Sequence, residues 1–511
     1  MLVQLTSAAI LGIDASPVSI EVCLSRGIRF SLVGLPDNAV RESHERIVSA
    51  LRVNGMDLPR NQITINMAPA DLRKEGTSYD LPLAVGIMAA GGYVPVEALE
   101  GTLFIGELSL DGCLRPVHGI LPVAVMANKL GLKRMVLPAA NAQEASIVEG
   151  LDVYGMENLG QLKGFLTGKQ SVEPFKDQTG HHVQQQRSNP FDFADVKGQE
   201  LVKRAIEVAC AGGHNIMLVG PPGAGKTMMA KCIPGILPPM SLQESLETTK
   251  IHSVAGKMDT SLSLITERPY RSPHHSISAI ALIGGGNKPQ PGEISLAHNG
   301  VLFLDELPEF QRHVLEVLRQ PLEDRTINVS RARYNVNYPA GFMLVASMNP
   351  CPCGYYNDPS KQCVCAPGQV QKYLNKISGP LLDRIDLQVE IMPVPFEKLS
   401  DTQTAESSAT IRERVKQARM RQEERFNQLS NISCNASMSA SELRVHAQPD
   451  KNGMLLLKNA MEKLHLSARA YERILKVSRT IADLDESDTI QTAHLAEAIQ
   501  YRMFDRAKWG T

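Results

Sequence analysis

Short apolar runs alternate with helical patterns along the first third of the chain. Runs such as QITINMAP and KRMVLP are typical of strands, whereas AVRESHERIVSALRVNG and LPVAVMANKLG place apolar residues at helical spacing. This alternation predicts an α/β domain over residues 1–168. Residues 169–189 are polar, rich in Gln and without apolar periodicity, and we expect them to form a linker.

The same alternation returns at residue 190 and continues to residue 395, which predicts a second α/β domain. A further polar break, SDTQTAESSAT, separates this domain from a strongly helical remainder. There ATIRERVKQARMRQEERFNQ and ARAYERILKVSRTIADL place small or apolar residues at helical spacing beside charged faces. Residues 396–511 should therefore form a helical bundle, and the whole chain is predicted to be an α/β multidomain protein.

The bulk composition argues against several classes of protein. The 511 residues exceed what one core can hold, and 43% hydrophobic with 21% charged residues is typical of soluble globular proteins. No apolar run is long enough to span a bilayer and no signal peptide is recognisable, so we expect a cytoplasmic protein. Nine cysteines in such a chain argue against a disulfide framework. A formal net charge of −1 predicts that any DNA contact comes from local basic patches or from a pore.

A glycine-rich loop supplies the strongest chemical signal. The stretch NIMLVGPPGAGKTMMAKCI fits the pattern G-x-x-x-x-G-K-[ST], with an apolar strand before it and a helix after it. Backbone N–H groups of such a loop surround phosphates, while the lysine reaches the β- and γ-phosphates and the threonine holds Mg²⁺. We therefore predict a site for ATP and Mg²⁺. Its residues are Gly220, Pro221, Pro222, Gly223, Ala224, Gly225, Lys226 and Thr227.

Two further apolar strands end in polar side chains that complete such a site. In NGVLFLDELPEF, Asp305 is placed to hold Mg²⁺ through water and Glu306 to polarise the attacking water. In GFMLVASMNPCPC, the strand ends at Asn349, whose amide can orient that water. An asparagine before proline is also a common turn residue, so this alternative stays open for Asn349.

The phosphate loop, the Asp-Glu strand, the Asn-tipped strand and the trailing helices together resemble an AAA+ ATPase. The stretch RPYRSPHHSISAIALIGGGNKPQPGEISLAHNG resembles the magnesium-chelatase-like branch, and within it the ComM/YifB family, over nearly the whole chain. The resemblance implies a ring hexamer with active sites at subunit boundaries. It matches Arg384 of SGPLLDRIDLQVEI to an arginine offered to the neighbour's γ-phosphate. It matches Arg469 to a second sensor, with Arg473 one turn further on as the alternative.

Residues 1–168 resemble the proteolytic domain of Lon, which implies a ribosomal S5 domain 2-like α/β fold. The segment KEGTSYDLPLAV aligns Ser78 with the catalytic serine, but HGILPV places Leu121 where the partner lysine belongs. A serine hydroxyl needs an adjacent base, and leucine cannot be one. Lys74 and His118 lie nearby in sequence without occupying the matching position. We therefore expect a catalytically dead domain, with Ser78 as a helix N-cap or turn residue.

Four cysteines follow the Asn-tipped strand in NPCPCGYYNDPSKQCVCAPG. Clustered thiolates in a cytosolic chain suit a tetrahedral structural Zn²⁺, although C-x-C is tighter than the usual C-x₂-C spacing. The alternative is a set of reduced thiols stiffened by the prolines. A metal would rigidify the segment that joins Asn349 to Arg384. The four ligands would be Cys351, Cys353, Cys363 and Cys365.

Two inserts could meet DNA. ERPYRSPHHSISAIALIGGGNKPQPGE is rich in Gly, Pro, His and basic residues, and RTINVSRARYNVNYPAGF is predicted to be a hairpin with arginines near its tip. In a ring, such loops can line the pore and follow a phosphate backbone. The candidates are Lys288, Arg331 and Arg333, and the alternative is that they are solvated turns or subunit contacts.

Three functions remain after these observations. The family resemblance implies a hexameric DNA helicase that drives branch migration on single-stranded and branched DNA during recombination in natural transformation, with recombination proteins as possible partners. A chelatase-like ATPase that remodels a protein is the second hypothesis. The third, an ATP-dependent protease, is disfavoured by Leu121. We favour the DNA motor.

Overall fold

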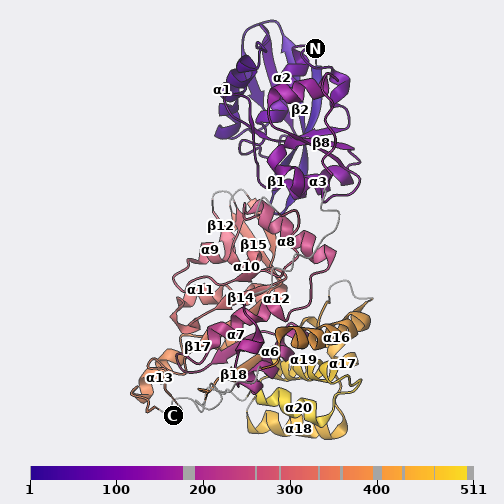
Figure 1. Ribbon diagram of the computed structural model, residues 1–511. Coiled ribbons are helices and arrows are strands. Elements are labelled where there is room, and N and C mark those ends of the chain that lie inside the picture. Colours follow the sequence, from indigo (N-terminus) through magenta and orange to yellow (C-terminus); the bar gives the residue numbers. More distant parts are fainter. Residues whose placement is uncertain are drawn as a thin grey trace. The chain divides into compact units, whose positions relative to one another are not determined.

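The structure is a computed structural model (Figure 1), and it describes residues 2–176, 190–258, 262–286, 289–331, 334–356, 361–394, 405–427, 432–464 and 466–502. The chain divides into two compact units. The first unit contains residues 1–184 and 242–265, and the second contains 185–241 and 266–511. Each unit is described by itself.

The first unit is built on a mixed sheet with the strand order β3-β4-β2-β1-β5-β8-β9. Strands β1 and β2 form a long antiparallel hairpin, and β2 continues antiparallel to β4. Buried Val18, Ile20 and Val22 alternate with more exposed residues along β2, as expected for a half-buried strand. The strands are β1 (Leu2–Leu11), β2 (Asp14–Ser25), β3 (Phe30–Val33), β4 (Gln62–Ala68), β5 (Thr102–Phe104), β8 (Arg134–Pro138) and β9 (Asp152–Met156), with a separate small pair β6 (Glu107–Leu108) and β7 (Leu114–Arg115).

Helices cover this sheet, and one of them comes from far along the chain. Helix α2 is buried along its whole length, in agreement with the apolar sequence that follows its first residue, Asp80. Helix α8 packs against α3, where the N–H of Gly119 donates to the carbonyl of Ser253 at 3.2 Å and the Ser253 hydroxyl donates to Glu144. The structure therefore places 242–265 in the first unit, although we had assigned it to the ATPase core. The helices are α1 (Asn38–Val53), α2 (Asp80–Ala90), α3 (Ile120–Lys129), α4 (Ala142–Ala145), α5 (Leu159–Leu166) and α8 (Leu242–Val254).

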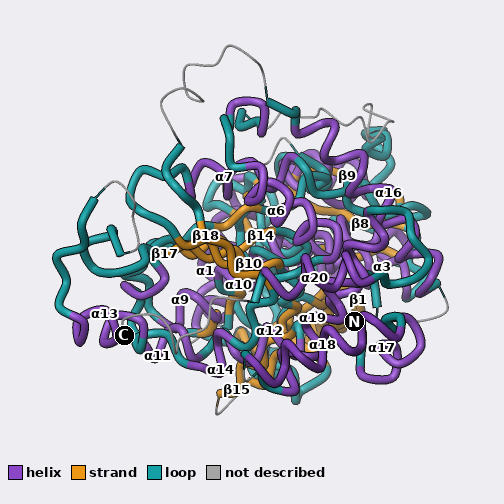
Figure 2. Tube along the Cα trace, turned by 90° about the horizontal axis from the view of Figure 1, so that it is seen from below, coloured by secondary structure: helices purple, strands orange, loops and turns teal. Residues whose placement is uncertain are grey.

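The second unit holds a parallel sheet with the order β11-β14-β17-β10-β18 (Figures 1 and 2). Strand β10 lies between β17 and β18, and β17 lies between β10 and β14. Since all are parallel, the carboxyl ends of β10, β14 and β17 meet at one edge, where ligands of open α/β sheets bind. The strands are β10 (Ile216–Val219), β11 (Tyr270–Arg271), β14 (Val301–Leu304), β17 (Met343–Met348) and β18 (Leu387–Glu390).

Short helices and hairpins connect these strands. Helix α6 contacts β18 and α7 contacts β17, and both are drawn alongside the sheet in Figure 2. A predicted hairpin is confirmed as the antiparallel pair β15 (Thr326–Arg331) and β16 (Tyr334–Pro339). The remaining elements are α6 (Glu200–Gly212), α7 (Lys226–Cys232), α9 (Ala279–Ile283), β12 (Gly284–Gly285), β13 (Gln290–Pro291), α10 (Glu293–Leu296), α11 (Arg312–Glu316), α12 (Arg319–Asp324), α13 (Pro367–Leu374) and α14 (Gly379–Leu382).

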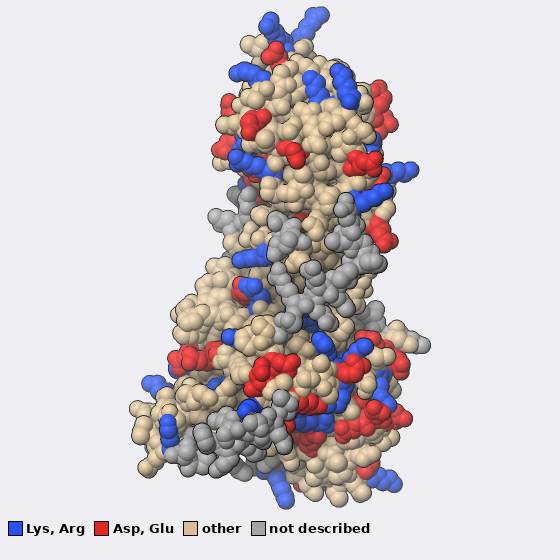
Figure 3. All heavy atoms as spheres, viewed as in Figure 1, with Lys and Arg blue, Asp and Glu red and all other residues tan. Residues whose placement is uncertain are grey.

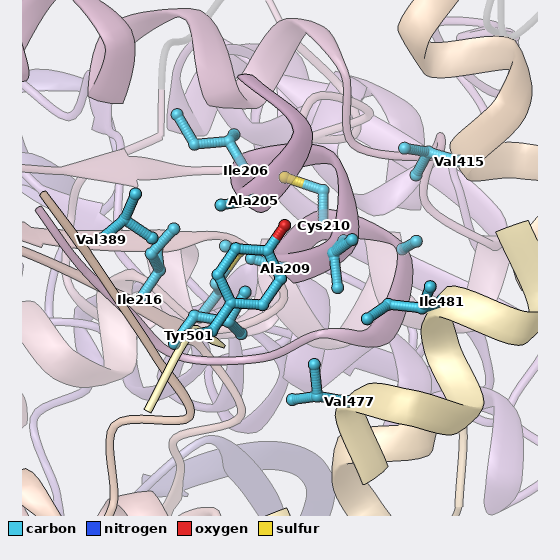
Figure 4. Close-up of a cluster of buried hydrophobic side chains, with 14 of the residues drawn as sticks. Ala205, Ile206, Ala209, Cys210, Ile216, Val389, Val415, Val477, Ile481 and Tyr501 are labelled. Atoms are coloured by element: carbon cyan, nitrogen blue, oxygen red, sulfur yellow. The ribbon is translucent and has the colours of Figure 1, made fainter. Parts of the chain in front are cut away.

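The predicted C-terminal helical bundle is confirmed, and it shares a core with the sheet. Side chains of α6, β10 and β18 pack against Val415 of α16 and against Val477 and Ile481 of α19 (Figure 4). Burying this continuous apolar cluster holds the bundle against α6 and the sheet. The helices are α16 (Ser408–Phe426), α17 (Ala440–His446), α18 (Lys451–Lys463), α19 (Ala468–Leu484) and α20 (Thr492–Gln500).

Charge is mixed on the face drawn in Figure 3. Basic and acidic side chains alternate over the first unit, and they are again interspersed over the C-terminal helices. This agrees with the near-zero net charge and gives no broad patch of one sign on that face. Among the described residues, no helix combines the length and the apolar character that crossing a bilayer requires.

Candidate functional site

The glycine-rich loop joins β10 to α7 and has little space for side chains. The N–H of Gly220 donates to the carbonyl of Met348 on β17 at 3.2 Å. A Cβ added to Gly220 would lie 2.5 Å from the carbonyl oxygen of Ile391, so this position requires glycine. Gly223 and Gly225 have φ values of +79° and +87°, which other residues rarely adopt. The loop is therefore held close to the sheet edge, where its glycines allow the backbone to curl around an anion.

Lys226 lies buried at the base of this loop. Its ammonium donates to the carbonyls of Gly220 at 2.6 Å and Pro221 at 2.9 Å, and to Asn349 Oδ1 at 3.0 Å. Burial lowers the pKa of Lys226, while the nearby carboxylates of Asp305 and Glu306 oppose that shift. The three donors of the ammonium are thus gathered where the loop and the Asn-tipped strand meet.

Asp305 and Thr227 come together as the sequence predicts. The Thr227 hydroxyl donates to Asp305 Oδ2 at 2.9 Å. The other carboxylate oxygen accepts from the Ser347 hydroxyl and, at 3.1 Å, from the N–H of Glu306. A hydroxyl and a carboxylate are the oxygen ligands that Mg²⁺ takes beside a phosphate, so the donor set fits this ion. Ser347 is a partner that sequence reasoning missed, because it is an unremarkable small residue of β17.

Glu306 follows Asp305 in a backbone conformation that only tertiary structure can impose. Its φ is +53°, and its side chain is 57% exposed. Its N–H also approaches the Ser347 hydroxyl at 3.3 Å. His275, four residues after β11, places Nδ1 3.9 Å from Glu306 Oε2. We had assigned the stretch around His275 to DNA or subunit contacts, whereas the structure sets it beside the predicted catalytic carboxylate.

Asn349 directly follows β17 and is half-buried. Its amide oxygen accepts a hydrogen bond from the Lys226 ammonium. The structure therefore brings it to the phosphate loop, so it is more than a turn residue. The proposed orientation of a water molecule by Asn349 stays a prediction.

Arg384 follows α14 and occupies a different part of the second unit. Its guanidinium donates to the carbonyl of Pro380 at 2.7 Å and to Glu323 Oε1. The Arg384 hydrogen bond holds the pKa of Glu323 below its ordinary value. Both residues line a pocket of about 550 Å³ whose lining includes no residue of the phosphate loop. Arg384 thus lies away from the phosphate loop of its own chain, and its action on another subunit's nucleotide stays a prediction.

The two candidate sensor arginines at the start of α19 have different surroundings. Arg469 is exposed, whereas Arg473 donates to Asp386 Oδ1 at 2.8 Å. Asp386 is buried and also accepts from the N–H of Asn215 at 2.9 Å, with His214 Nδ1 at 3.6 Å. Burial would raise the pKa of Asp386, but Arg473, His214 and the Asn215 N–H hold it well below its ordinary value. Arg473 thus has a fixed structural partner.

The four cysteines form a compact cluster after β17. Their Sγ atoms all lie within 4.8 Å of one another. Cys351 Sγ is 3.3 Å from Cys353 Sγ and 3.7 Å from Cys363 Sγ. The Sγ atoms of Cys353 and Cys363 are 3.5 Å apart. Four sulfurs bound to one zinc at about 2.3 Å would lie about 3.8 Å apart, so the set of Cys351, Cys353, Cys363 and Cys365 fits a tetrahedral metal.

One thiol of the cluster ionises easily. Burial would raise the pKa of Cys353, but the N–H groups of Tyr355 and Val364 lower it to about 6. A thiolate is the form of cysteine that binds metal. The cluster can therefore hold a metal ion.

The Lon-like residues of the first unit lie in a turn (Ser78), in a helix (Leu121) and at an isolated β-bridge (Lys74). Ser78 lies in a turn, where its carbonyl accepts a hydrogen bond from the N–H of Gly106 at 2.9 Å. The N-cap residue of α2 is Tyr79, so the prediction that Ser78 is a helix N-cap is wrong. Leu121 is buried in α3. Lys74 is buried, its ammonium donates to the carbonyl of Pro69, and burial lowers its pKa.

Of the three residues predicted to contact DNA, the structure describes only the backbone of Arg331. Arg331 is the last residue of β15 and pairs with Tyr334 across the hairpin. Lys288 and Arg333 lie outside the described residues. Their contact with DNA stays a prediction.

Comparison with known families covers almost the whole chain. Residues 192–399 match the family model described as "Magnesium chelatase, subunit ChlI". Residues 20–141 match "Subunit ChlI of Mg-chelatase", and residues 405–502 match "Magnesium chelatase, subunit ChlI C-terminal".

Individual proteins resemble all or part of the chain. YifB of Escherichia coli K12 is 44% identical over 500 residues, covering 98% of this chain and 96% of its own. The competence protein ComM of Haemophilus influenzae is 43% identical over 506 residues, covering 98% of this chain and 97% of its own. Lon protease 2 of Bacillus subtilis is 29% identical over 168 residues, 29% of this chain and 28% of that protease. The chain belongs to the ComM/YifB family of magnesium-chelatase-like AAA+ proteins.

Proposed function

We propose that this protein is a Mg²⁺-dependent ATPase that works as a hexameric, cytoplasmic DNA helicase and drives branch migration during recombination in natural transformation. The observation that carries the ATPase part is the meeting of four side chains from three strand ends. Lys226 bonds to Asn349, and Thr227 bonds to Asp305. The ComM relative is named a competence protein, and this supports the DNA part.

The residues at the sheet edge divide the work of hydrolysis. The loop N–H groups and Lys226 bind the phosphates, and Thr227 with Asp305 would hold Mg²⁺, which neutralises charge on the β- and γ-phosphates when bound. Glu306 polarises the attacking water, and Asn349 orients it while fixing the Lys226 ammonium. Electrostatic positioning of this kind supplies most of the catalysis in phosphoryl transfer.

A second subunit would complete the site. Arg384 is anchored by Glu323 away from its own phosphate loop, as an arginine acting on a neighbour must be. Such an arginine is typically worth about 10³–10⁵ in rate, because it neutralises charge that develops in the transition state. Assembly into a closed ring would therefore be required for full activity.

The β15–β16 hairpin would bring DNA to this ring. Arg331 is the last residue of β15, Arg333 follows it two positions later in the sequence, and Lys288 belongs to the other insert. Basic loops that line a pore bind the phosphate backbone without reading bases, which suits single-stranded and branched DNA. Recombination proteins would be the partners that load such a motor.

Two other functions are ranked lower. Matches to magnesium chelatase over 192–399 and 405–502 favour, as the second candidate, an ATPase that remodels a protein. Proteolysis is disfavoured, since Leu121 is buried in α3 and Lys74 bonds to a carbonyl. We propose that the Lon-like domain is a catalytically dead scaffold. We further propose that the cysteine cluster holds a structural Zn²⁺, because four close thiols are its preferred ligand set.

Strand exchange on synthetic three- and four-way DNA junctions tests the motor. Wild-type protein with ATP should resolve the junctions, and Lys226→Ala and Arg384→Ala should not. Lys129→Ala, an exposed lysine at the end of α3, is the matched control and should behave as wild type. Unmoved junctions together with ATP hydrolysis that is indifferent to DNA would reject the helicase and favour a protein client.

A further inference from the structure

The cysteine cluster touches the phosphate loop. Gly354 lies between the two C-x-C pairs, and a Cβ added to it would lie 2.5 Å from Cδ and 2.8 Å from Cγ of Pro222. Pro222 belongs to the phosphate loop. The backbone of Gly354, with φ +86°, therefore packs directly on the proline ring, and no larger residue fits between them.

The same segment also holds the other end of the loop. Asn349, which accepts from the Lys226 ammonium at 3.0 Å, stands two residues before Cys351. Cys351 is buried, and its carbonyl accepts from the N–H of Gly354 at 3.0 Å. Residues 349–354 thus support the phosphate loop at two points, Pro222 and Lys226.

Regular secondary structure does not hold this segment in place. Between Met348 and Pro367, the described residues form neither helix nor strand. What draws the two sides of the segment together is the cysteine cluster, in which Cys351 and Cys353 meet Cys363 at 3.7 Å and 3.5 Å. Closing a loop with a metal removes conformations that would otherwise have to be ordered when a ligand binds.

We propose that a thiolate-bound metal of the Zn²⁺ class, held by the four cysteines, is the rigid support of the phosphate loop, so that metal occupancy sets the affinity for ATP. This inference rests on the proposed ATPase function. The metal would act without touching the nucleotide, through Gly354 on Pro222 and through Asn349 on Lys226.

The metal is tested first, on the full chain. Purified protein should contain about one zinc per chain, and exchange for Co²⁺ should give the absorption bands of tetrahedral cobalt bound to thiolates. Cys353→Ser and Cys363→Ser should lose these bands. Cys113→Ser, which removes an exposed cysteine elsewhere, should keep them.

The coupling is tested by nucleotide binding in the presence of Mg²⁺. Protein stripped by a chelator and returned to Mg²⁺ buffer should bind a fluorescent ATP analogue about tenfold more weakly than the zinc form, a difference of about 1.4 kcal/mol. Restoring Zn²⁺ should restore the affinity. Circular dichroism of the stripped protein should retain the helical signal, which separates loosening of the loop from unfolding.

A glycine variant tests the contact without touching the ligands. Gly354→Ala should retain the metal and weaken nucleotide binding about tenfold, because its Cβ collides with Pro222. Gly131→Ala is the matched control, since Gly131 has φ +73° with no atom within 4 Å of the added Cβ. It carries the same backbone strain in the first unit and should bind nucleotide as wild type does.

The outcomes separate the steps of the proposal. Wild-type protein without zinc and without cobalt bands would overturn the metal site. Metal that binds but can be removed with no change in nucleotide affinity would overturn the coupling, as would a Gly354→Ala variant with normal affinity. If the zinc-loaded wild type bound no nucleotide at all, the ATPase proposal itself would fail. Should the cysteine variants not fold, the stripped protein and Gly354→Ala still decide the question.

Discussion

Replacing Arg473 should destabilise the second unit, because Arg473 forms an ion pair with the buried Asp386. Its guanidinium is 18% exposed and donates at 2.8 Å to Asp386, whose side chain is 1% exposed. Removing one partner of a buried ion pair leaves an uncompensated charge and costs about 3–5 kcal/mol. His214 and Arg502 remain near Asp386 and soften the loss. We therefore expect about 3 kcal/mol for Arg473→Ala, near the lower end of that range.

Thermal unfolding followed by circular dichroism measures this loss. A change of 1 kcal/mol shifts the midpoint by about 2–4 °C in a domain of this order of size, so Arg473→Ala should melt about 6 °C or more below wild type. Asp386→Asn combined with Arg473→Ala should recover most of the loss, because the buried charge is gone. Arg469→Ala, an exposed arginine four residues earlier on the same helix, is the control and should change stability by less than about 0.5 kcal/mol.

The stability difference between wild type and Arg473→Ala should depend on pH through the ionisation of Asp386. In wild type the folded-state pKa of Asp386 lies below its unfolded value of about 3.9, so its contribution is present above that pH and is lost on acidification. Without Arg473, burial raises the pKa of Asp386 in the folded state, and protonation relieves the penalty. The difference in melting midpoint between wild type and Arg473→Ala should therefore become smaller as pH falls from 7 toward 5. An unchanged midpoint for Arg473→Ala, or no recovery in the double variant, would refute the reasoning.

Four other predictions follow from the site. Lys226→Ala and Arg384→Ala should each abolish ATP hydrolysis, yet an equal mixture should regain activity at about a quarter of interfaces if the arginine acts in trans, which steady-state ATPase rates show. Gly220→Ala should cost about 10²-fold in hydrolysis rate, since its Cβ meets the Ile391 carbonyl at 2.5 Å and displaces the loop. His275→Ala should lower the hydrolysis rate by up to about fivefold, as expected for a partly exposed pair with Glu306. Ser78→Ala should leave junction resolution and melting unchanged, and loss of a peptidase activity would contradict the dead-scaffold interpretation.

The nucleotide site was predictable because its chemistry is local. A strand, a glycine-rich loop and a helix follow one another directly in the sequence, and apolar strands end at Asp305 and at Asn349. Once a parallel sheet is inferred, ends of neighbouring strands must meet. The pairs Thr227–Asp305 and Lys226–Asn349 confirm that these predicted residues lie together. The cysteine cluster was visible for the same reason, since its two pairs are ten residues apart.

Features that depend on tertiary packing escaped the sequence. The sequence of helix α8 lies within the range predicted for the second α/β domain. Only the contact of α8 with α3 shows that it belongs to the first unit. Ser347 and His275 belong to no motif, so their approach to Asp305 and Glu306 could not be inferred from spacing. The choice between two arginines of α19 was open because both lie on one helical turn. Arg473 pairs with the buried carboxylate of Asp386, which lies directly before β18, and a sequence pattern cannot reveal a partner so far away in the chain.

In the ring that we propose, the order of elements would let one subunit report its nucleotide to the next. Asn349, the cysteine cluster, α13, α14 and Arg384 follow one another on a single stretch of the second unit. The stretch begins at a side chain bonded to Lys226 and ends at one anchored to Glu323. A contact made by Lys226 with phosphate competes with its contact with Asn349, because an ammonium has three donors and all three are engaged at this site. A stiff segment passes such a displacement on, whereas a loose one absorbs it. In the proposed ring, the cysteine cluster would therefore matter for communication between neighbouring subunits as well as for nucleotide affinity. Removing the proposed metal should abolish the dependence of hydrolysis on neighbouring subunits before it abolishes hydrolysis itself.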